Sequence, residues 1–548
     1  MPGSQTSGTG APPAIVEPEK RTLSLATNIN AFPPFKGVSV KEDAMDALTS
    51  RDSAEDTIGQ HVVYRLRSGV RCWFRPNAKP LLVLDFPLRA LAVQHCWRSL
   101  LERMAWGDFV PFEVLASCVP DMPAEKTEIF LEHLVRKAFC DRKGINVLPE
   151  YPRVSIIVPV RNRQEDLALC LDSLTTLQYP AEKTEIIVVD DNSSDDSLRV
   201  AARFPVKVIS MKTHKQVSYC RNLAAREAKG EILAFIDSDC VADPLWLQEL
   251  IPAFRNPDVG AVGGLVDSYF EDKRLDRYEK VKSSLHVSTW FKRSSEKERF
   301  FYVPSCNLLI RRDLFLELGG FREDLHVGED VDLCWRLQNH GEALEYRPVG
   351  KVYHKHRNSL LPFCIRRFQY GTSEPTLQQL HSDRIKQVFF PLPEFLFWVL
   401  VTASACLSCV PLLIIAVAIL FLHVCRLYSC VQKRNIPIHV AAISGAVIRS
   451  SLSLVYHACS FVSRYYLVFL LLLWPFVSWL SMVALGMHLC AGIIQYRITG
   501  PQLNPLSFFA FFTLEQISYQ LGVWWGCVRR LYFKPVVPRL VLSRLRSL

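Results

Sequence analysis

The stretch that most constrains the fold is Glu231–Cys240, which reads EILAFIDSDC. Its apolar residues Ile232–Ile236 predict a strand that is buried on both faces, as in a parallel sheet. The strand runs directly into Asp237, Ser238 and Asp239. Ligands bind at the carboxyl ends of strands in open α/β sheets, and two carboxylates there suit Mg²⁺ or Mn²⁺. The alternative is that the triplet only forms a turn or caps the next helix.

Strands and helices alternate before this stretch. Apolar runs at Val154–Val160, Glu185–Val189 and Val206–Ser210 predict three further strands. Amphipathic helices are expected up to about Leu177 and over Gln216–Ala228. This alternation predicts an α/β fold, a doubly wound nucleotide-binding domain with right-handed crossovers.

The chain of 548 residues is too long for a single hydrophobic core, so several domains are expected. Residues 1–58 are rich in Pro, Gly, Ser and Thr and are predicted to be disordered. Residues 59–148 are predicted to form a small winged-helix-like α+β domain that begins with a β-hairpin over His61–Phe74. Three amphipathic helices complete this domain, over Ala90–Met104, Phe112–Cys118 and Ala124–Ala138.

The apolar content rises after the α/β domain, which is assigned to residues 153–385. Residues 391–494 are predicted to be a membrane region. They contain two apolar stretches, Phe395–Leu422 and Tyr466–Ile494, and each is long enough to cross a hydrocarbon core of about 30 Å. The sequence therefore predicts a multi-pass protein of the cell membrane.

Residues 495–548 are predicted to form an interfacial amphipathic helix, Phe508–Cys527, followed by a basic tail. Two crossings would leave Arg426, Lys433 and Arg434 on the far side of the membrane. That arrangement opposes the tendency of basic loops to stay in the cytoplasm. Re-entrant hairpins would remove the conflict, but the apolar stretches are short for them.

The net charge of +10 comes without a basic run interleaved with aromatic residues, so a nucleic-acid partner is not expected. Anionic membrane lipid or an anionic substrate accounts for the charge instead. The 17 cysteines are dispersed along the chain and form no disulfide framework. This pattern is typical of reduced thiols in the cytosol.

Four ordered blocks resemble the family-2 glycosyltransferases with the GT-A fold: VSIIVPVRNR, EIIVVDDNSSDDS, RNLAAREAKGEILAFIDSD and GFREDLHVGEDVDLCWRL. The resemblance implies a metal-dependent, inverting transferase that uses a nucleotide-sugar donor, with UDP-glucose expected. The donor requires the catalytic domain to be cytoplasmic. No Gln-x-x-Arg-Trp block of processive synthases follows, so a short glycan is expected rather than a long polymer.

The N-terminal region, the α/β domain, the apolar C-terminal segments and the closing stretch SYQLGVWWGCVRRLYFKPVVPRL together resemble the membrane-associated glycosyltransferases of mycofactocin biosynthesis. That likeness implies a small redox-cofactor precursor as acceptor, extended by a short β-glucan. The N-terminal part resembles a small peptide-binding domain, which implies a peptide or maturation partner. Two rival functions remain: a transferase with a lipid-linked acceptor for cell-surface polysaccharide, and a non-catalytic membrane scaffold.

The resemblance also implies roles for residues at the strand ends. Asp190 and Asp191 would accept hydrogen bonds from uracil or ribose, the alternative being a cap or turn. Arg221 and Asn222 would lie beside the base, the alternative for Arg221 being a structural ion pair. The carboxylates of Asp237 and Asp239 would bind the ribose and the metal.

The remaining implied residues follow the Asp-x-Asp strand. His354 would be a further metal ligand, or else part of a basic phosphate-binding loop with Lys355, His356 and Arg357. Asp330 would be the general base, with Glu329 as its substitute, unless either only complements the helix dipole. Further donor- or sugar-contacting candidates are Asn307, Trp335 and Arg336.

Overall fold

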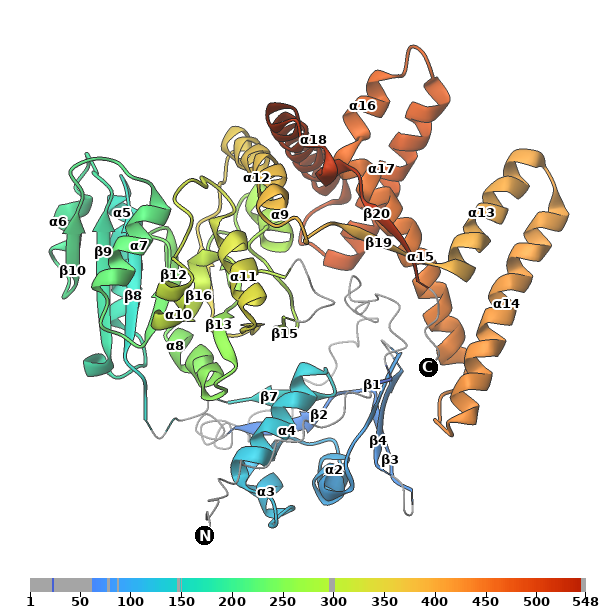
Figure 1. Ribbon diagram of the computed structural model, residues 1–548, viewed down its shortest axis with the longest axis horizontal. Helices are drawn as coiled ribbons and strands as arrows, with labels where there is room; N and C mark the ends of the chain where they lie inside the picture. The colour runs from blue at the N-terminus through green and yellow to red at the C-terminus, as the bar shows by residue number, and fades with distance from the viewer. Residues whose placement is uncertain are drawn as a thin grey trace, which may run out of the picture.

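The computed structural model describes residues 22–23, 62–75, 79–85, 88–144, 148, 150–294 and 301–543. The predicted disorder of residues 1–58 falls outside the described residues, except for the short strand β1 (Thr22–Leu23). Figure 1 shows three parts: an α/β core, a small α+β unit below it and a group of long helices at the upper right.

The core is built on an eight-stranded mixed sheet with the order β10-β9-β8-β11-β16-β13-β17-β15. The first four strands in this order run parallel, and every residue of β8 and β11 is buried. Continuous apolar strands of this kind need cover on both faces. The strands are β8 (Val154–Val160), β9 (Thr184–Asp190), β10 (Lys207–Ser210), β11 (Ile232–Phe235), β13 (Val259–Gly263), β15 (Lys292–Arg293), β16 (Leu308–Arg311) and β17 (Ala343–Tyr346).

Helices cover both faces of this sheet, which confirms the predicted doubly wound α/β fold. Ile156 and Val158 point to one face, with α5 (Gln164–Thr175), α6 (Ser197–Ala201) and α8 (Trp246–Leu250). Ile157, between them in the strand, points to the other face because side chains alternate. The helices of that second face are α7 (Val217–Glu227), α10 (Arg312–Glu317) and α11 (Glu329–His340).

The small unit has two sheets and three helices, α2 (Arg98–Met104), α3 (Phe112–Ser117) and α4 (Ala124–Arg136). The expected hairpin over His61–Phe74 is wrong. Strand β2 (Val63–Leu66) pairs with β6 (Val110–Pro111) and β7 (Cys140–Lys143), whereas β3 (Val70–Trp73) pairs with β4 (Leu81–Asp85) of the other sheet. Strand β5 (Leu88–Ala92) takes the start of the first expected helix. Alternating residues indicate a strand but not its partner.

Helices α12 (Leu360–Leu380) and α18 (Pro505–Arg530) pack side by side at close range along most of their length. A Cβ added to Gly522 would lie 2.1 Å from the Phe368 carbonyl oxygen, so only glycine allows this approach. The helix predicted over Phe508–Cys527 is present and packs on the protein, and a hydrogen bond from Tyr278 to Glu515 joins it to α9 (Arg274–Lys282). The Trp524 indole N–H donates to the Tyr465 carbonyl oxygen.

The two expected spans are each divided by a turn. Phe395–Leu422 becomes α13 (Leu392–Leu407) and α14 (Val410–Lys433), because Ser408 adopts a left-handed conformation with φ +50°. Tyr466–Ile494 becomes α16 (Leu467–Leu472) and α17 (Ser478–Thr499). The helix α15 (Val440–Tyr465) lies between them. By length and composition α14, α15 and α17 are the three described helices that could cross a membrane.

Candidate active site

The parallel strands bring the predicted acidic residues to one edge of the sheet. Asp190 is the last residue of β9, and Asp237 and Asp239 follow β11. Strand β8 lies between β9 and β11, so Asp190 and the start of the Asp-x-Asp segment are two strands, about 10 Å, apart. This edge is the carboxyl end of the parallel strands, where the sequence places the site.

Asp190 and Asp191 differ in what their carboxylates contact. Asp190 is 1% exposed, and its Oδ1 has no hydrogen-bond partner among the described residues. Asp191 accepts from the backbone N–H groups of Lys215 and Gln216 and lies 2.7 Å from His214 Nδ1. Asp191 therefore holds the loop before α7, and Asp190 is the carboxylate with an oxygen left for a ligand.

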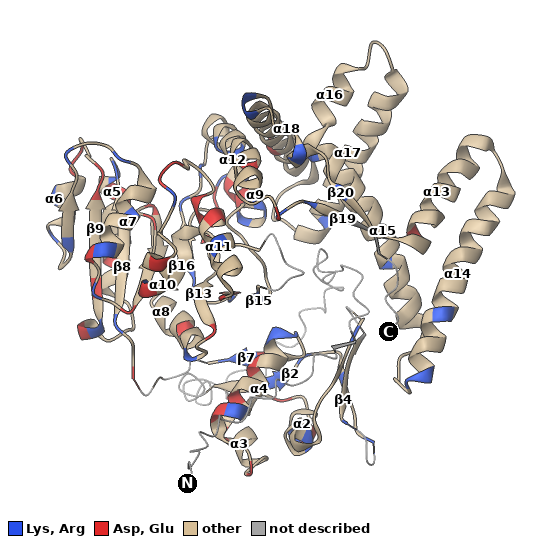
Figure 2. Cartoon of the chain, in the orientation of Figure 1, with Lys and Arg blue, Asp and Glu red and all other residues tan. Residues whose placement is uncertain are grey.

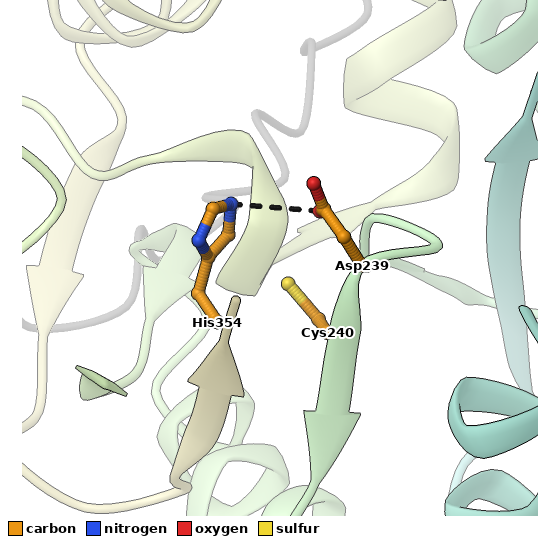
Figure 3. Close-up of side chains that lie close together, drawn as sticks. All are labelled: Asp239, Cys240 and His354. Carbon is orange, nitrogen blue, oxygen red and sulfur yellow. Dashed lines mark ion pairs between the residues drawn. The ribbon is translucent and has the colours of Figure 1, made fainter. Parts of the chain in front are cut away.

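A second, three-stranded sheet brings His354 to Asp239. Strand β12 (Cys240–Ala242) pairs with β18 (Val352–His354), which also pairs with β14 (Val266–Ser268). The register sets His354 opposite Cys240. His354 Nε2 lies 3.5 Å from Asp239 Oδ1, and the ring faces the carboxylate in Figure 3.

Asp239, Cys240 and His354 form a group whose ligand atoms lie within 4.8 Å of one another. Burial, followed by its contact with Cys306, raises the pKa of the Cys240 thiol well above its ordinary value. A protonated thiol is a poor ligand, which leaves one carboxylate and one imidazole. This donor set fits Mn²⁺, or Mg²⁺ that keeps waters and takes phosphate oxygens for its other positions.

Basic side chains surround Asp239 from two segments. Arg163 Nη1 lies 3.5 Å from Asp239 Oδ2, and Arg357 Nη1 lies 3.7 Å from the same oxygen. Lys355 pairs with Asp166 at 2.7 Å, within α5. The sequence did not single out Arg163 as a site residue. Its position three residues after β8, at the same sheet edge as Asp190, was the signal that could have identified it.

One buried guanidinium links the Asp-x-Asp segment to the start of α11. Arg221 is 2% exposed, pairs with Asp237 and donates from Nη1 to Glu329 Oε1 at 3.0 Å. Although burial raises the pKa of Asp237, Arg221 and then His354 hold it below its usual value. Arg221 thus forms the structural ion pair that was its alternative role, and this pair fixes two acidic segments beside each other.

Asp330 lies next to Glu329 in the first turn of α11. The helix begins after Gly328, whose φ of +88° favours glycine, and the Asp330 carboxylate accepts from the Val331 N–H. Burial, and then the neighbouring charge of Glu329, raises the pKa of Asp330 to about 7. A carboxylate with such a pKa suits general base catalysis near neutral pH.

Two predicted ligand contacts are instead internal hydrogen bonds. Asn222 bonds to both backbone groups of Phe321 and to the Glu323 carboxylate. Asn307 is fully buried, accepts from the Trp246 indole and donates to the carbonyl oxygens of residues 265 and 350. The expectation that these amides contact donor or acceptor is corrected, because their hydrogen-bonding atoms are already used.

Trp335 and Arg336 also point away from the site. Trp335 is 4% exposed and packs in a small cluster with Leu325 and Leu377. Arg336 pairs with Asp332 and donates to two backbone carbonyl oxygens of the preceding loop. Both side chains stabilise the position of α11, and the expected contact with sugar or diphosphate is corrected.

The comparison with known protein families agrees with this site. The profile described as Glycosyl transferase family 2 matches residues 155–319, which include Asp190, Arg221 and the Asp-x-Asp segment. The chain carries a glycosyl transferase family 2 domain. It is a glycosyltransferase. Asp330 and His354 lie beyond the matched residues, so the structure is what brings them to the matched segment.

Similar proteins carry related names. The pre-mycofactocin glycosyltransferase of Mycobacterium tuberculosis (strain ATCC 25618 / H37Rv) is 28% identical over 405 residues, which is 72% of this glycosyltransferase and 83% of that protein. Glycosyltransferase AglE of Haloferax volcanii is 27% identical over 46% of this chain and 81% of its own length. The O-antigen biosynthesis protein RfbC of Myxococcus xanthus is 31% identical over 40% of this chain and 19% of its own.

Solved structures of other proteins overlap with parts of this glycosyltransferase. A mannosyltransferase from Pyrobaculum calidifontis, solved with GDP-Man and Mn²⁺, is 18% identical, with a TM-score of 0.35 over 57% of this chain and 91% of that chain. TarS 1–349 from S. aureus is 20% identical, with a TM-score of 0.31 over 41% of this chain and 64% of that chain.

Proposed function

We propose that the protein is an inverting, metal-dependent transferase that moves glucose from UDP-glucose onto a small redox-cofactor precursor and builds a short β-glucan. The observation that carries this proposal is the Arg221 guanidinium, which holds Asp237 and Glu329 on either side of it. This contact joins a donor-binding segment to a candidate base, and a transferase needs both beside one sugar.

The donor end of the proposed site uses Asp190 for the nucleoside and Asp237 for the ribose. Asp239 and His354 would hold Mg²⁺ or Mn²⁺, which supplies positive charge to the departing diphosphate when it is bound. Arg163 and Arg357 contact Asp239 from two sides and would bind phosphate oxygens. The sequence left two roles open for the segment around His354, a metal ligand or a phosphate-binding loop. With two basic residues beside the metal ligands, the proposed site combines both roles.

Asp330 is the proposed general base. Its carboxylate takes the proton of the acceptor hydroxyl while that oxygen bonds to the anomeric carbon and the bond to the diphosphate oxygen breaks. UDP leaves with the electron pair of that bond. One base and direct displacement invert the anomeric configuration. Glu329 is less suited to this role because Arg221 occupies one of its oxygens.

The acceptor is proposed from the relatives. The match to pre-mycofactocin glycosyltransferase spans most of both chains and supports a redox-cofactor precursor. The O-antigen relative and the apolar helices favour the second candidate, a lipid-linked acceptor for cell-surface polysaccharide. The intact acidic residues of the site argue against a non-catalytic scaffold.

The proposed setting is the cytoplasmic side of the membrane, because nucleotide-sugar donors are made in the cytosol. The small N-terminal unit is proposed to bind a peptide or maturation partner. Exposed apolar side chains on that unit, Trp106 and Ile129, support a binding role.

Transfer by the full-length enzyme, measured as UDP release with UDP-glucose and Mn²⁺, tests the proposal. Either an aqueous metabolite extract or a lipid extract supplies the acceptor. Asp330→Asn should lower transfer by about 10²–10⁴-fold and leave UDP binding intact. The matched control is Asp324→Asn, an exposed aspartate six residues earlier. Glucose recovered in the lipid fraction would show that the lipid-linked acceptor is the substrate. Unchanged turnover of Asp330→Asn would show that Asp330 is not the base.

A further inference from the structure

Two helical hairpins present a large exposed apolar surface. Helices α13 and α14 form the first, and α16 and α17 form the second. In Figure 1 the first turn lies at the upper right and the second at the top, both away from the small unit. Phe476 at the second turn is 84% exposed, Trp479 beside it 67%, and Leu407 at the first turn 70%. Such contiguous apolar surface requires a partner that removes it from water.

The chemistry of this surface identifies hydrocarbon as that partner. Residues 395–425 and 465–496 contain no Asp, Glu, Lys or Arg, and the outer halves of these helices carry neither charge colour in Figure 2. Exposed basic residues begin where the apolar segments end: Arg426, Lys433, Arg434 and Arg497. Each hairpin is therefore apolar at its turn and basic at the ends of its helices. The apolar turn matches the acyl chains of a membrane, and the basic residues match its anionic headgroups.

The first hairpin begins and ends on the same side. Helix α13 starts directly after β19 (Gln387–Pro391), which pairs with β20 (Arg539–Ser543) beside the core. The far end of α14 returns to the small unit, where Leu427 and Val431 pack with Val83 and Leu88. Helix α13 has 16 residues, about 24 Å, and falls short of a hydrocarbon core of about 30 Å.

The second hairpin is also anchored at both ends. Helix α16 has 6 residues, about 9 Å, and the Tyr466 hydroxyl just before it donates to the Val536 carbonyl oxygen. At the other end of the hairpin, Gln495 of α17 accepts from Lys282 of α9. A helix as short as α16 cannot cross a bilayer.

Helix α15 is held by the water-soluble parts at both of its ends. Near its start, Ile443 and Val447 pack against the same sheet of the small unit as α14. At its end, the Tyr465 hydroxyl donates to Glu374 of α12. Both ends of a crossing helix cannot contact parts that lie on one side of the membrane.

We infer that the protein is monotopic: both hairpins enter one leaflet from the side of the active site and return, and no helix of this region crosses the bilayer. This arrangement replaces the two crossings that hydropathy favours. It also keeps Arg426, Lys433 and Arg434 on the cytoplasmic side, which removes the conflict with the positive-inside tendency. The inference concerns only the membrane region and does not depend on the identity of donor or acceptor.

Native cysteines test the topology in the full chain. Cys406 is exposed beside the first turn, and Cys96 is exposed in the small unit. Sealed membrane vesicles of both orientations would be treated with a membrane-impermeant maleimide, and labelled peptides identified by mass spectrometry. We expect Cys96 to be labelled from one side only and Cys406 from neither side until detergent is added. Labelling of Cys406 from the side opposite Cys96 would establish a crossing, and labelling from the same side would show an uninserted hairpin; both overturn the inference.

Three variants give a second measure. Asn435→Cys, in the connection between α14 and α15, should be labelled together with Cys96, and labelling from the other side would refute the return of α14. The double variant Phe476→Asp with Trp479→Asp should lower the membrane-bound fraction at least tenfold, because charges at the turn would enter hydrocarbon. Trp106→Asp, on the small unit, should leave that fraction unchanged. Equal retention of the double variant would show that the second turn lies outside the leaflet.

Discussion

The raised pKa of Asp330 predicts a pH profile for the enzyme. A carboxylate acts as a base only when it is deprotonated, and Asp330 is half deprotonated at a pH of about 7. The kcat/KM for the acceptor should therefore rise about tenfold between pH 6 and pH 8 and level off above. An aspartate with its ordinary pKa of 3.8 would give a flat profile over that range.

Removing the charge of Glu329 should move this profile. Burial is the larger cause of the raised pKa and remains in Glu329→Gln, whereas the repulsion by the neighbouring carboxylate is lost. The amide of this variant keeps an oxygen for Arg221, so the contact to the Asp-x-Asp segment is preserved. We expect the acidic limb to shift by about one pH unit toward lower pH, with a larger fraction of plateau activity at pH 6.

The assay is the pH dependence of UDP release with saturating donor and limiting acceptor. Asp324→Asn, which removes an exposed carboxylate paired with Arg322, is the control and should leave the limb in place. The assignment of the base to Asp330 would be refuted if the acidic part of the pH profile did not shift in Glu329→Gln. It would also be refuted if that part of the profile persisted in Asp330→Asn.

Two further predictions concern the metal and the buried amide. His354→Ala should raise the Mn²⁺ concentration for half-maximal transfer by at least about tenfold, with activity of the wild type lost in EDTA and restored by Mn²⁺; an unchanged Mn²⁺ titration would remove His354 from the metal site. Asn307→Ala should lower the free energy of unfolding in urea by about 1–3 kcal/mol, because the Trp246 indole and two carbonyl oxygens lose their partner. UDP affinity of the folded variant should be unchanged, and a selective loss of UDP binding would restore Asn307 to the donor site.

The sequence predicts those parts of the site that follow directly from strand ends. Asp190, Asp237 and Asp239 each come at or just after an apolar run, so the parallel sheet places them without any long-range information. His354 depends on the pairing of β18 with β12. No spacing in the chain shows that pairing, and only the resemblance to the family suggested a histidine there.

The wrong predictions of site residues concern side chains that could point either into the site or into the protein. Trp335 and Arg336 follow the candidate base on α11, and only the packing of that helix on Leu377 and on the loop before it turns both away from the site. Asn222 and Asn307 are polar residues of the type that binds ligands, but each satisfies buried backbone groups instead. Such choices depend on tertiary partners distant in the chain.

Hydropathy identified the apolar helices but not their turns. The first stretch changes direction at Ser408, and the local signal of the break is Pro411, which stands in the first turn of α14. The prediction of two apolar stretches also missed α15, because Arg449 and several serines lower the mean hydropathy of α15 to 1.2, against 2.5 for α14.

The parallel pairing of β19 with β20 has a consequence for biosynthesis. Strand β19 lies between the core and the first hairpin, and its partner is translated after every other described element. The preceding elements can fold while the ribosome is still at work, but this pairing can form only after β20 has been made. Among the described elements, the contact that ties the segment before the first hairpin to the C-terminal strand is therefore the last one that synthesis makes possible.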